Sequence, residues 1–214
     1  MKILPQSRIE DPMSETAARP TSPATAGIAD PGPLGLAGFA ATTFVLSAVN
    51  AGLIPKTVEP VVLPLALFYG GLAQLLAGMW EFRKNNTFGA TAFGTFGAFW
   101  LAFAFYVWQF AAKIPPADAA TATGMFLLVF TIFTGYMMIA SLRTNAVLIG
   151  VFVLLFLTFL FLTIGELGGA EGAGKIGGWL GLATAVVAWY GSFAVVTNTT
   201  FGRTVLPTGT IGKR

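Results

Sequence analysis

Six apolar stretches, separated by short polar segments, follow the polar N-terminal segment of the 214-residue chain. A helix needs about 20 consecutive apolar residues to cross the hydrocarbon core of a bilayer. The segments between the stretches carry proline, asparagine or glycine, which are typical of helix ends and turns. The pattern predicts an all-α membrane protein with six transmembrane helices, at residues 33–53, 61–82, 88–112, 119–142, 145–165 and 176–196.

One transmembrane unit, residues 30–199, follows from this pattern, with a polar tail on each side. Residues 1–29 are rich in Pro, Ala, Ser and Thr and contain no apolar stretch, so they bury too little surface to order themselves. We therefore predict a disordered N-terminal tail at 1–29 and a second tail at 200–214. No signal-peptide core precedes the first helix, which we expect to act as the insertion signal.

The cations are divided unequally between the two sides of the predicted membrane. Six spans put both termini on one side, and that side collects nine of the twelve lysines and arginines. The other side has Lys56, Lys113 and Lys175. Cytoplasmic loops carry an excess of lysine and arginine, so we predict a multi-pass protein of the cell membrane with both termini in the cytoplasm. The net charge of +3 thus reflects topology and not a nucleic-acid partner.

The composition excludes several classes of chemistry. Cysteine and histidine are both absent, which removes disulfides, thiolate catalysis, histidine-ligated haem and the usual soft-metal sites. No nucleophile-elbow, phosphate-loop or metalloprotease motif is present in the sequence. We therefore expect no enzymatic activity, no metal and no cofactor.

Two polar residues of the second stretch are candidates for function. Gln74 is an amide near the middle of the span, on a helical face that also carries glycines. An unpartnered buried amide is costly, so we predict that it faces a solute path, with hydrogen bonding between helices as the alternative. Glu81 lies at the membrane edge near Arg83 and Lys84. For Glu81 we predict an interfacial ion pair, and a proton-carrying role is the alternative.

Further polar side chains lie on the first and third helices. On the first helix, Phe39, Thr43 and Asn50 share one stripe, and Thr42 lies beside it. On the third, a threonine row runs beside an aromatic row that includes Phe96. Small polar groups next to bulky rings indicate a narrow path for a small polar solute, although threonines often bond their own backbone. The candidates for this path are Thr42, Thr43, Asn50, Asn86, Thr87 and Thr91, of which Asn86 is one of the residues expected to cap the third helix.

Three blocks carry a resemblance to a known family. The first is Asp30-Pro31-Gly32-Pro33-Leu34-Gly35-Leu36, the second is FYGGLAQLLAGMWEF with NNTFGATAF, and the third is FGRTVLP at residues 201–207. With these blocks in the same order, the chain resembles the acetate uptake transporters of the succinate-acetate permease type. The resemblance implies a ring-shaped homo-hexamer in the lipid bilayer, in which each six-helix protomer has its own path for acetate, related small carboxylates or succinate. The GxxxG pairs of the last helix, such as Gly177 with Gly181, fit close packing within the fold or between protomers.

The resemblance also implies a hydrophobic constriction made of a Phe, a Tyr and a Leu. Phe39 matches the Phe, whereas Phe96 stands at the Tyr position and lacks its hydroxyl. Leu155 and Ala188 match positions that affect substrate choice, and Asp30 replaces an Asn of the family signature, which adds a negative charge. The favoured hypothesis is carboxylate transport, channel-like or proton-coupled. A non-transporting scaffold or sensor, and an exporter of another small solute such as ammonium, are the alternatives.

Overall fold

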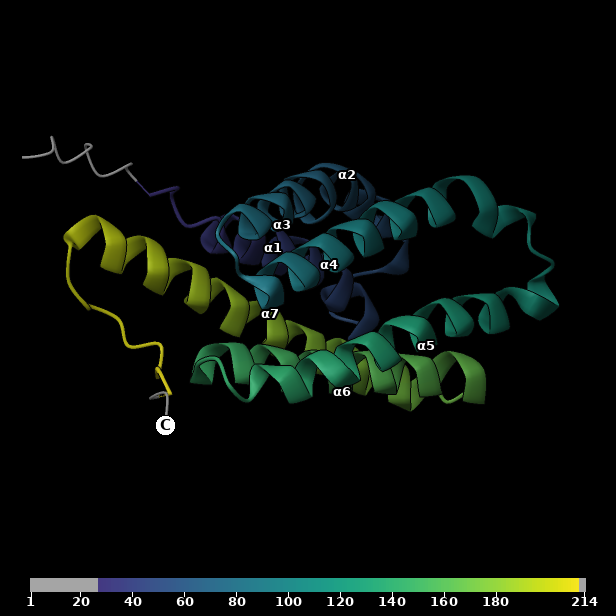
Figure 1. Ribbon diagram of the computed structural model, residues 1–214. Helices are drawn as coiled ribbons and strands as arrows, with labels where there is room; N and C mark the ends of the chain where they lie inside the picture. Colours follow the sequence, from purple (N-terminus) through teal and green to yellow (C-terminus); the bar gives the residue numbers. More distant parts are fainter. Residues whose placement is uncertain (1–26, 212–214) are drawn as a thin grey trace, which may run out of the picture.

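The computed structural model describes residues 27–211, which form six long helices packed side by side (Figure 1). The prediction of six spans is confirmed, because each helix is long and apolar enough to cross a membrane. The second and third spans are each built from several consecutive helical segments. The spans are α1 (Gly32–Asn50); η1 (Lys56–Val61), α2 (Val62–Leu67), η2 (Phe68–Ala73) and α3 (Gln74–Arg83); α4 (Thr87–Phe105), η3 (Tyr106–Phe110) and η4 (Ala111–Lys113); α5 (Pro116–Ser141); α6 (Ala146–Gly168); and α7 (Glu171–Phe201).

Local side-chain chemistry fixes several helix ends. The Asn86 side-chain oxygen accepts the N–H of Gly89 at 3.1 Å and so caps α4, as the sequence predicts for this turn. Asn145 caps α6 in the same way. Gly169 and Gly202 end α6 and α7 with φ of 63°, a left-handed conformation that glycine adopts without strain. Short turns result, so successive helices are antiparallel.

The helices form a ring in which helices that are consecutive in the sequence mostly pack side by side. Around the ring, α1 packs on α7 and on the α2–α3 span, α3 packs on α4, and α6 packs on both α5 and α7. Contacts between α4 and α5 are fewer. The two described chain ends lie at one end of the bundle with the turns at 84–86 and 142–145 (Figure 1), and we call this the terminal end. The opposite end, with the turns at 51–55 and 114–115, is the far end.

Glycines bring the helices into close contact inside one protomer. A β-carbon on Gly178 would collide with the backbone of Asn50 and Ala51, and one on Gly181 would collide with Ser47. Gly78 of α3 packs in the same way against the backbone of α4. The small residues of the second and sixth spans therefore serve packing within the chain.

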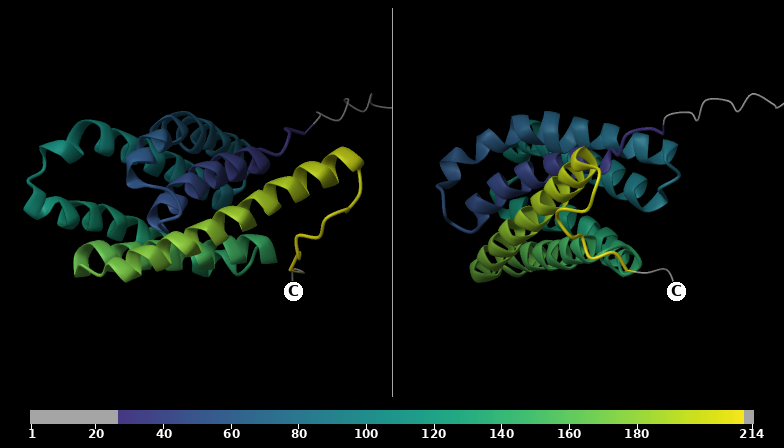
Figure 2. Two further views of the ribbon diagram at one scale, coloured as in Figure 1. Left: turned by 180° about the vertical axis from the view of Figure 1, so that it is seen from behind. Right: turned by 90° about the vertical axis from the view of Figure 1, so that its left-hand side faces the viewer.

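Three segments differ from the sequence expectation. Residues Phe68–Ala73 of the second span and Tyr106–Phe110 of the third form π-helical turns, where the sequence predicts uninterrupted α-helices. At the C-terminus, α7 continues to Phe201, and residues 203–211 fold back toward the start of α6 (Figure 2). We call residues 203–211 the C-terminal strap. The predicted tail at 200–214 is thus packed on the bundle up to residue 211, whereas residues 1–26 of the predicted N-terminal tail lie outside the described residues.

Candidate functional site

Two cavities lie inside the helix ring, one toward each end of the bundle. The terminal cavity has a volume of about 240 Å³, and its wall includes Asp30, Gln74, Glu81 and Phe96. The far cavity has a volume of about 170 Å³, with Asn50 on its wall. A single water needs roughly 10–15 Å³ of such space. Each cavity therefore has room for a small solute together with water.

An apolar cluster separates the two cavities. Phe39 of α1 and Leu155 of α6 line both cavities, and each is at most 4% exposed. Phe96 of α4 lies 5.8 Å from Phe39, measured between ring centroids, and stacks on Phe159 at 6.2 Å. An aliphatic side chain and three aromatic rings thus meet between the cavities. We call Phe39, Phe96, Leu155 and Phe159 the constriction.

The cavity walls carry three buried polar atoms without a hydrogen-bond partner within residues 27–211. They are the Thr43 hydroxyl oxygen, the Gln74 side-chain oxygen and the Trp100 indole nitrogen. Thr43 and Trp100 line the far cavity, and Gln74 lines the terminal cavity. Leaving a buried polar atom unsatisfied costs about 1–3 kcal/mol. Their position on the walls gives each atom access to water or to a solute.

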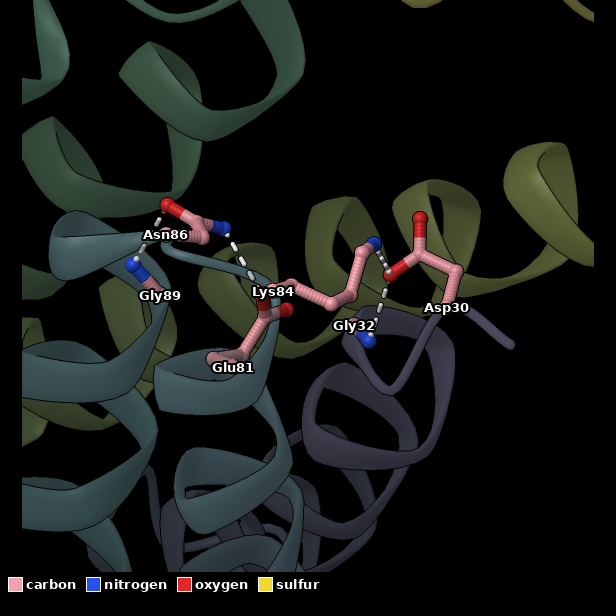
Figure 3. Close-up of polar contacts among 6 residues, drawn as sticks. All are labelled: Asp30, Gly32, Glu81, Lys84, Asn86 and Gly89. Carbon is pink, nitrogen blue, oxygen red and sulfur yellow. Dashed lines mark hydrogen bonds and ion pairs between the residues drawn. The ribbon is translucent and has the colours of Figure 1, made fainter. Parts of the chain in front are cut away.

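Polar contacts of Asp30 and of Glu81 define the mouth of the terminal cavity (Figure 3). One side-chain oxygen of Asp30 lies 3.0 Å from the Lys84 ammonium nitrogen and accepts the backbone N–H of Gly32 at 2.9 Å. The Asn86 side-chain nitrogen donates to Glu81 at 2.8 Å. Glu81 is 2% exposed. The predicted ion pair of Glu81 is therefore wrong, because Lys84 pairs with Asp30 across the turn and Asn86 supplies the partner of Glu81.

Beyond the far cavity lies a vestibule of about 420 Å³, which opens at the far end. Lys56, Glu59, Thr123 and Glu166 line both the far cavity and this vestibule. The Tyr106 hydroxyl lies 3.0 Å from the Thr123 hydroxyl on the vestibule wall. The far side of the path therefore holds two carboxylates and one ammonium group, whereas the constriction is apolar.

Most of the residues predicted to line a path do border a cavity. These are Phe39, Phe96 and Leu155 of the constriction, together with Thr43, Asn50, Gln74 and Asn86. Glu81, which the sequence predicts at the membrane edge, borders the terminal cavity as well.

Four predicted path residues lie elsewhere. Thr42 is fully buried, and its hydroxyl donates to the Gly38 and Leu65 carbonyls. Thr87 is exposed and Thr91 is half-buried, and neither borders the three cavities. Adjacent residues are about 100° apart on a helix, so α4 turns its aromatic row to the path and its threonine row away. Ala188 is buried in α7 behind the cavity walls.

Sequence reasoning missed other wall residues. Trp100 follows Phe96 by one helical turn, and this spacing is the signal that could have found it. Glu59 and Glu166 lie near helix ends, where charged side chains are common, so their sequence positions carry no special signal. Their shared wall becomes apparent only in the folded chain, where both border the far cavity and the vestibule.

Comparison with known proteins now places the chain in a family. A family model described as GPR1/FUN34/yaaH matches residues 14–212. The chain belongs to the GPR1/FUN34/yaaH family. The match spans all six helices, and it confirms the resemblance found in the sequence.

Relatives within the GPR1/FUN34/yaaH family carry transport names. Ammonia transport outward protein 2 of Saccharomyces cerevisiae is 44% identical over 78% of this chain, and the chain spans 61% of that protein's length. The succinate-acetate/proton symporter SatP of Escherichia coli is 38% identical, over 85% of this chain and 96% of SatP. A solved structure of the bacterial acetate channel SatP has a TM-score of 0.80 with 38% identity, and the match covers 86% of this chain and all of that chain.

Proposed function

We propose that this protein transports acetate and related small carboxylates across a cell membrane, through the path inside each protomer. The observation that carries the proposal is the set of unpartnered polar atoms of Thr43, Gln74 and Trp100 on both sides of an apolar constriction. The Thr43 hydroxyl and the Trp100 indole N–H can donate to a carboxylate without holding it as tightly as a lysine or arginine would, and the Gln74 oxygen can accept from water or from a protonated acid. Weak binding at several places favours passage and release. The names of the SatP relatives support the same substrate class.

Uptake of labelled acetate into proteoliposomes tests this proposal. Purified protein should raise uptake well above that of empty liposomes, and unlabelled acetate should compete. An imposed inward proton gradient distinguishes proton-coupled transport from a channel. The gradient drives a proton-coupled carrier to accumulate acetate above equilibrium, whereas a channel only speeds equilibration. A test variant is Gln74→Leu, whose side chain has nearly the volume of glutamine but lacks the amide. We expect this variant to take up acetate more slowly than wild type. Uptake no faster than in empty liposomes would contradict the proposal.

Ammonium export is the second candidate function. Glu59 and Glu166 on the far vestibule would attract a cation, and the yeast relative is named for outward ammonia transport. Efflux of labelled methylammonium from the same proteoliposomes tests it. Methylammonium efflux without acetate uptake would favour this candidate over carboxylate transport. A non-transporting scaffold has no physical need for the buried, unpartnered polar atoms on the cavity walls.

We further propose that the terminal end faces the cytoplasm and that the protein forms a ring-shaped homo-hexamer. The excess of lysine and arginine at the terminal end supports this orientation. Arg83, Lys84, Arg143 and Arg203 lie there, whereas Lys56, Lys113 and Lys175 lie at the far end. The family resemblance supports the hexamer. Because each path runs within one helix ring, assembly would multiply the paths without changing their walls.

A further inference from the structure

The charge balance at the mouth of the terminal cavity suggests how the protein could distinguish solutes by charge. Two charged residues, Asp30 and Glu81, are among those that line this cavity, and both are carboxylates. Lys84 lies next to them but points its ammonium group at Asp30, at 3.0 Å (Figure 3). This cation beside the mouth is thus already paired. An approaching anion meets a neutralised lysine and the negative charge of Glu81.

At this mouth, a solute with two negative charges is repelled more strongly than a solute with one. Because Asp30 and Lys84 balance each other, a monocarboxylate brings one charge to the field of Glu81, and a dicarboxylate brings two. Coulomb repulsion grows with the product of the charges, so a dianion is disfavoured more than a monoanion. The ion pair of Asp30 and Lys84 is partly exposed, with side chains 42% and 29% accessible. Salt therefore weakens the effect.

Asparagine is the isosteric replacement that isolates the charge of Asp30. The two side chains have nearly the same shape and differ in charge. An asparagine oxygen could accept the same two hydrogen bonds, from Gly32 and from Lys84, so the cap of α1 would persist. The charge would differ: asparagine leaves Lys84 positive toward the cavity. Asp30 thus changes the field at the mouth while keeping its geometry.

We propose that Asp30 is a specificity-determining residue that favours monocarboxylates over dicarboxylates by neutralising Lys84 at the terminal mouth. The proposal rests on the proposed carboxylate transport, and it goes further by assigning the discrimination between singly and doubly charged acids. It predicts that this chain transports succinate less well, relative to acetate, than the same chain with asparagine at position 30.

The test measures uptake of labelled acetate and labelled succinate at pH 7.5, where succinate is mostly a dianion. Full-length wild type is compared with Asp30→Asn, with Asp30→Asn combined with Lys84→Gln, and with Asp118→Asn as control. Asp118 is an exposed acid at the far end, away from the terminal cavity. We expect Asp30→Asn to raise the succinate-to-acetate ratio about threefold. The double variant should return toward the wild-type ratio, the control should match wild type, and 0.5 M salt should reduce the gain.

A ratio that stays at the wild-type value in a folded, acetate-transporting Asp30→Asn protein overturns the proposal. An equal rise in the double variant also overturns it, because Lys84 would then have no part in the effect. Failure of wild type to take up either acid contradicts carboxylate transport itself. In that case ligand-dependent shifts in melting temperature decide the role of Asp30. Succinate should stabilise Asp30→Asn more than wild type, and equal stabilisation overturns the proposal.

Discussion

At the scale of single residues, Phe39 is one of the side chains that stand between the two cavities. Its ring lines both cavities and lies next to Phe96. We predict that Phe39→Ala raises leak and admits carboxylates larger than acetate, because the space between the cavities widens. Removing a buried ring also costs about 3–5 kcal/mol of stability. Uptake of acids of increasing size, normalised to folded protein, measures the change.

A matched control separates gating from packing. Phe133 packs on Phe96 at 5.2 Å but lines neither cavity, so Phe133→Ala should lose similar stability and keep the size limit.

Restoring the hydroxyl of the family with Phe96→Tyr should raise acetate flux at an unchanged protein level, since a hydroxyl can donate to the carboxylate. If Phe39→Ala and Phe96→Tyr both keep the wild-type rate and size limit, the constriction has no gating role.

The sequence could identify some wall residues because they are anomalies within an apolar run. Gln74 and Thr43 are of this kind. It could not choose between Thr42 and Thr43, which are adjacent, because small shifts in helix rotation decide which one faces a carbonyl and which one faces a cavity. Leu155 looks like any other leucine of its span, so hydropathy could not single it out. Only the family resemblance points to this position, and its place at the constriction follows from tertiary packing.

At the scale of elements, two side chains of α7 hold the C-terminal strap: the Tyr190 hydroxyl donates to the Pro207 carbonyl at 2.7 Å, and Asn198 makes three further bonds. The Asn198 side chain donates to the Leu206 carbonyl at 2.8 Å and accepts the N–H groups of Val205 and Leu206. We predict that Asn198→Ala releases the strap and destabilises the protein by about 1–3 kcal/mol. Hydrogen exchange at residues 205–206 and at Ala146, which donates to the Gly209 carbonyl, should accelerate. Thr199→Ala, at an exposed neighbour, is the control and should leave exchange unchanged.

The strap also shows which parts of the fold can be predicted from sequence patterns. Hydropathy predicts all six spans, because a span must be apolar along its whole length. It stops the last helix at 196, since the polar residues that follow, among them Asn198, carry no apolar signal. The side chain of Asn198 bonds to residues seven and eight positions further along the chain, on the folded-back strap. The π-helical turn at Phe68–Ala73 depends on close packing of Gly70 and Gly71 with neighbouring side chains, which hydropathy does not encode.

At the scale of the whole molecule, the proposed orientation makes a prediction about labelling. The chain has no cysteine, so a single introduced thiol is a unique label. Ala117 is exposed at the far end, and Thr204 is exposed on the strap at the terminal end. A membrane-impermeant maleimide should label Ala117→Cys in intact cells, and Thr204→Cys only after the cells are opened. The reverse pattern would place the terminal end outside the cell.

Assembly and transport are separable in this architecture, because the constriction lies inside one helix ring and is built by residues of a single chain. We predict a hexamer, seen as six protomer masses by native mass measurement in mild detergent, with six independent paths. Leu155→Trp should block a path by overfilling the constriction, provided that the folded amount of the variant is checked. In hexamers mixed from wild-type and Leu155→Trp protomers, acetate flux should fall in direct proportion to the blocked fraction. A steeper fall would mean that protomers share a path or open together, and masses of monomers or dimers alone would contradict the hexamer.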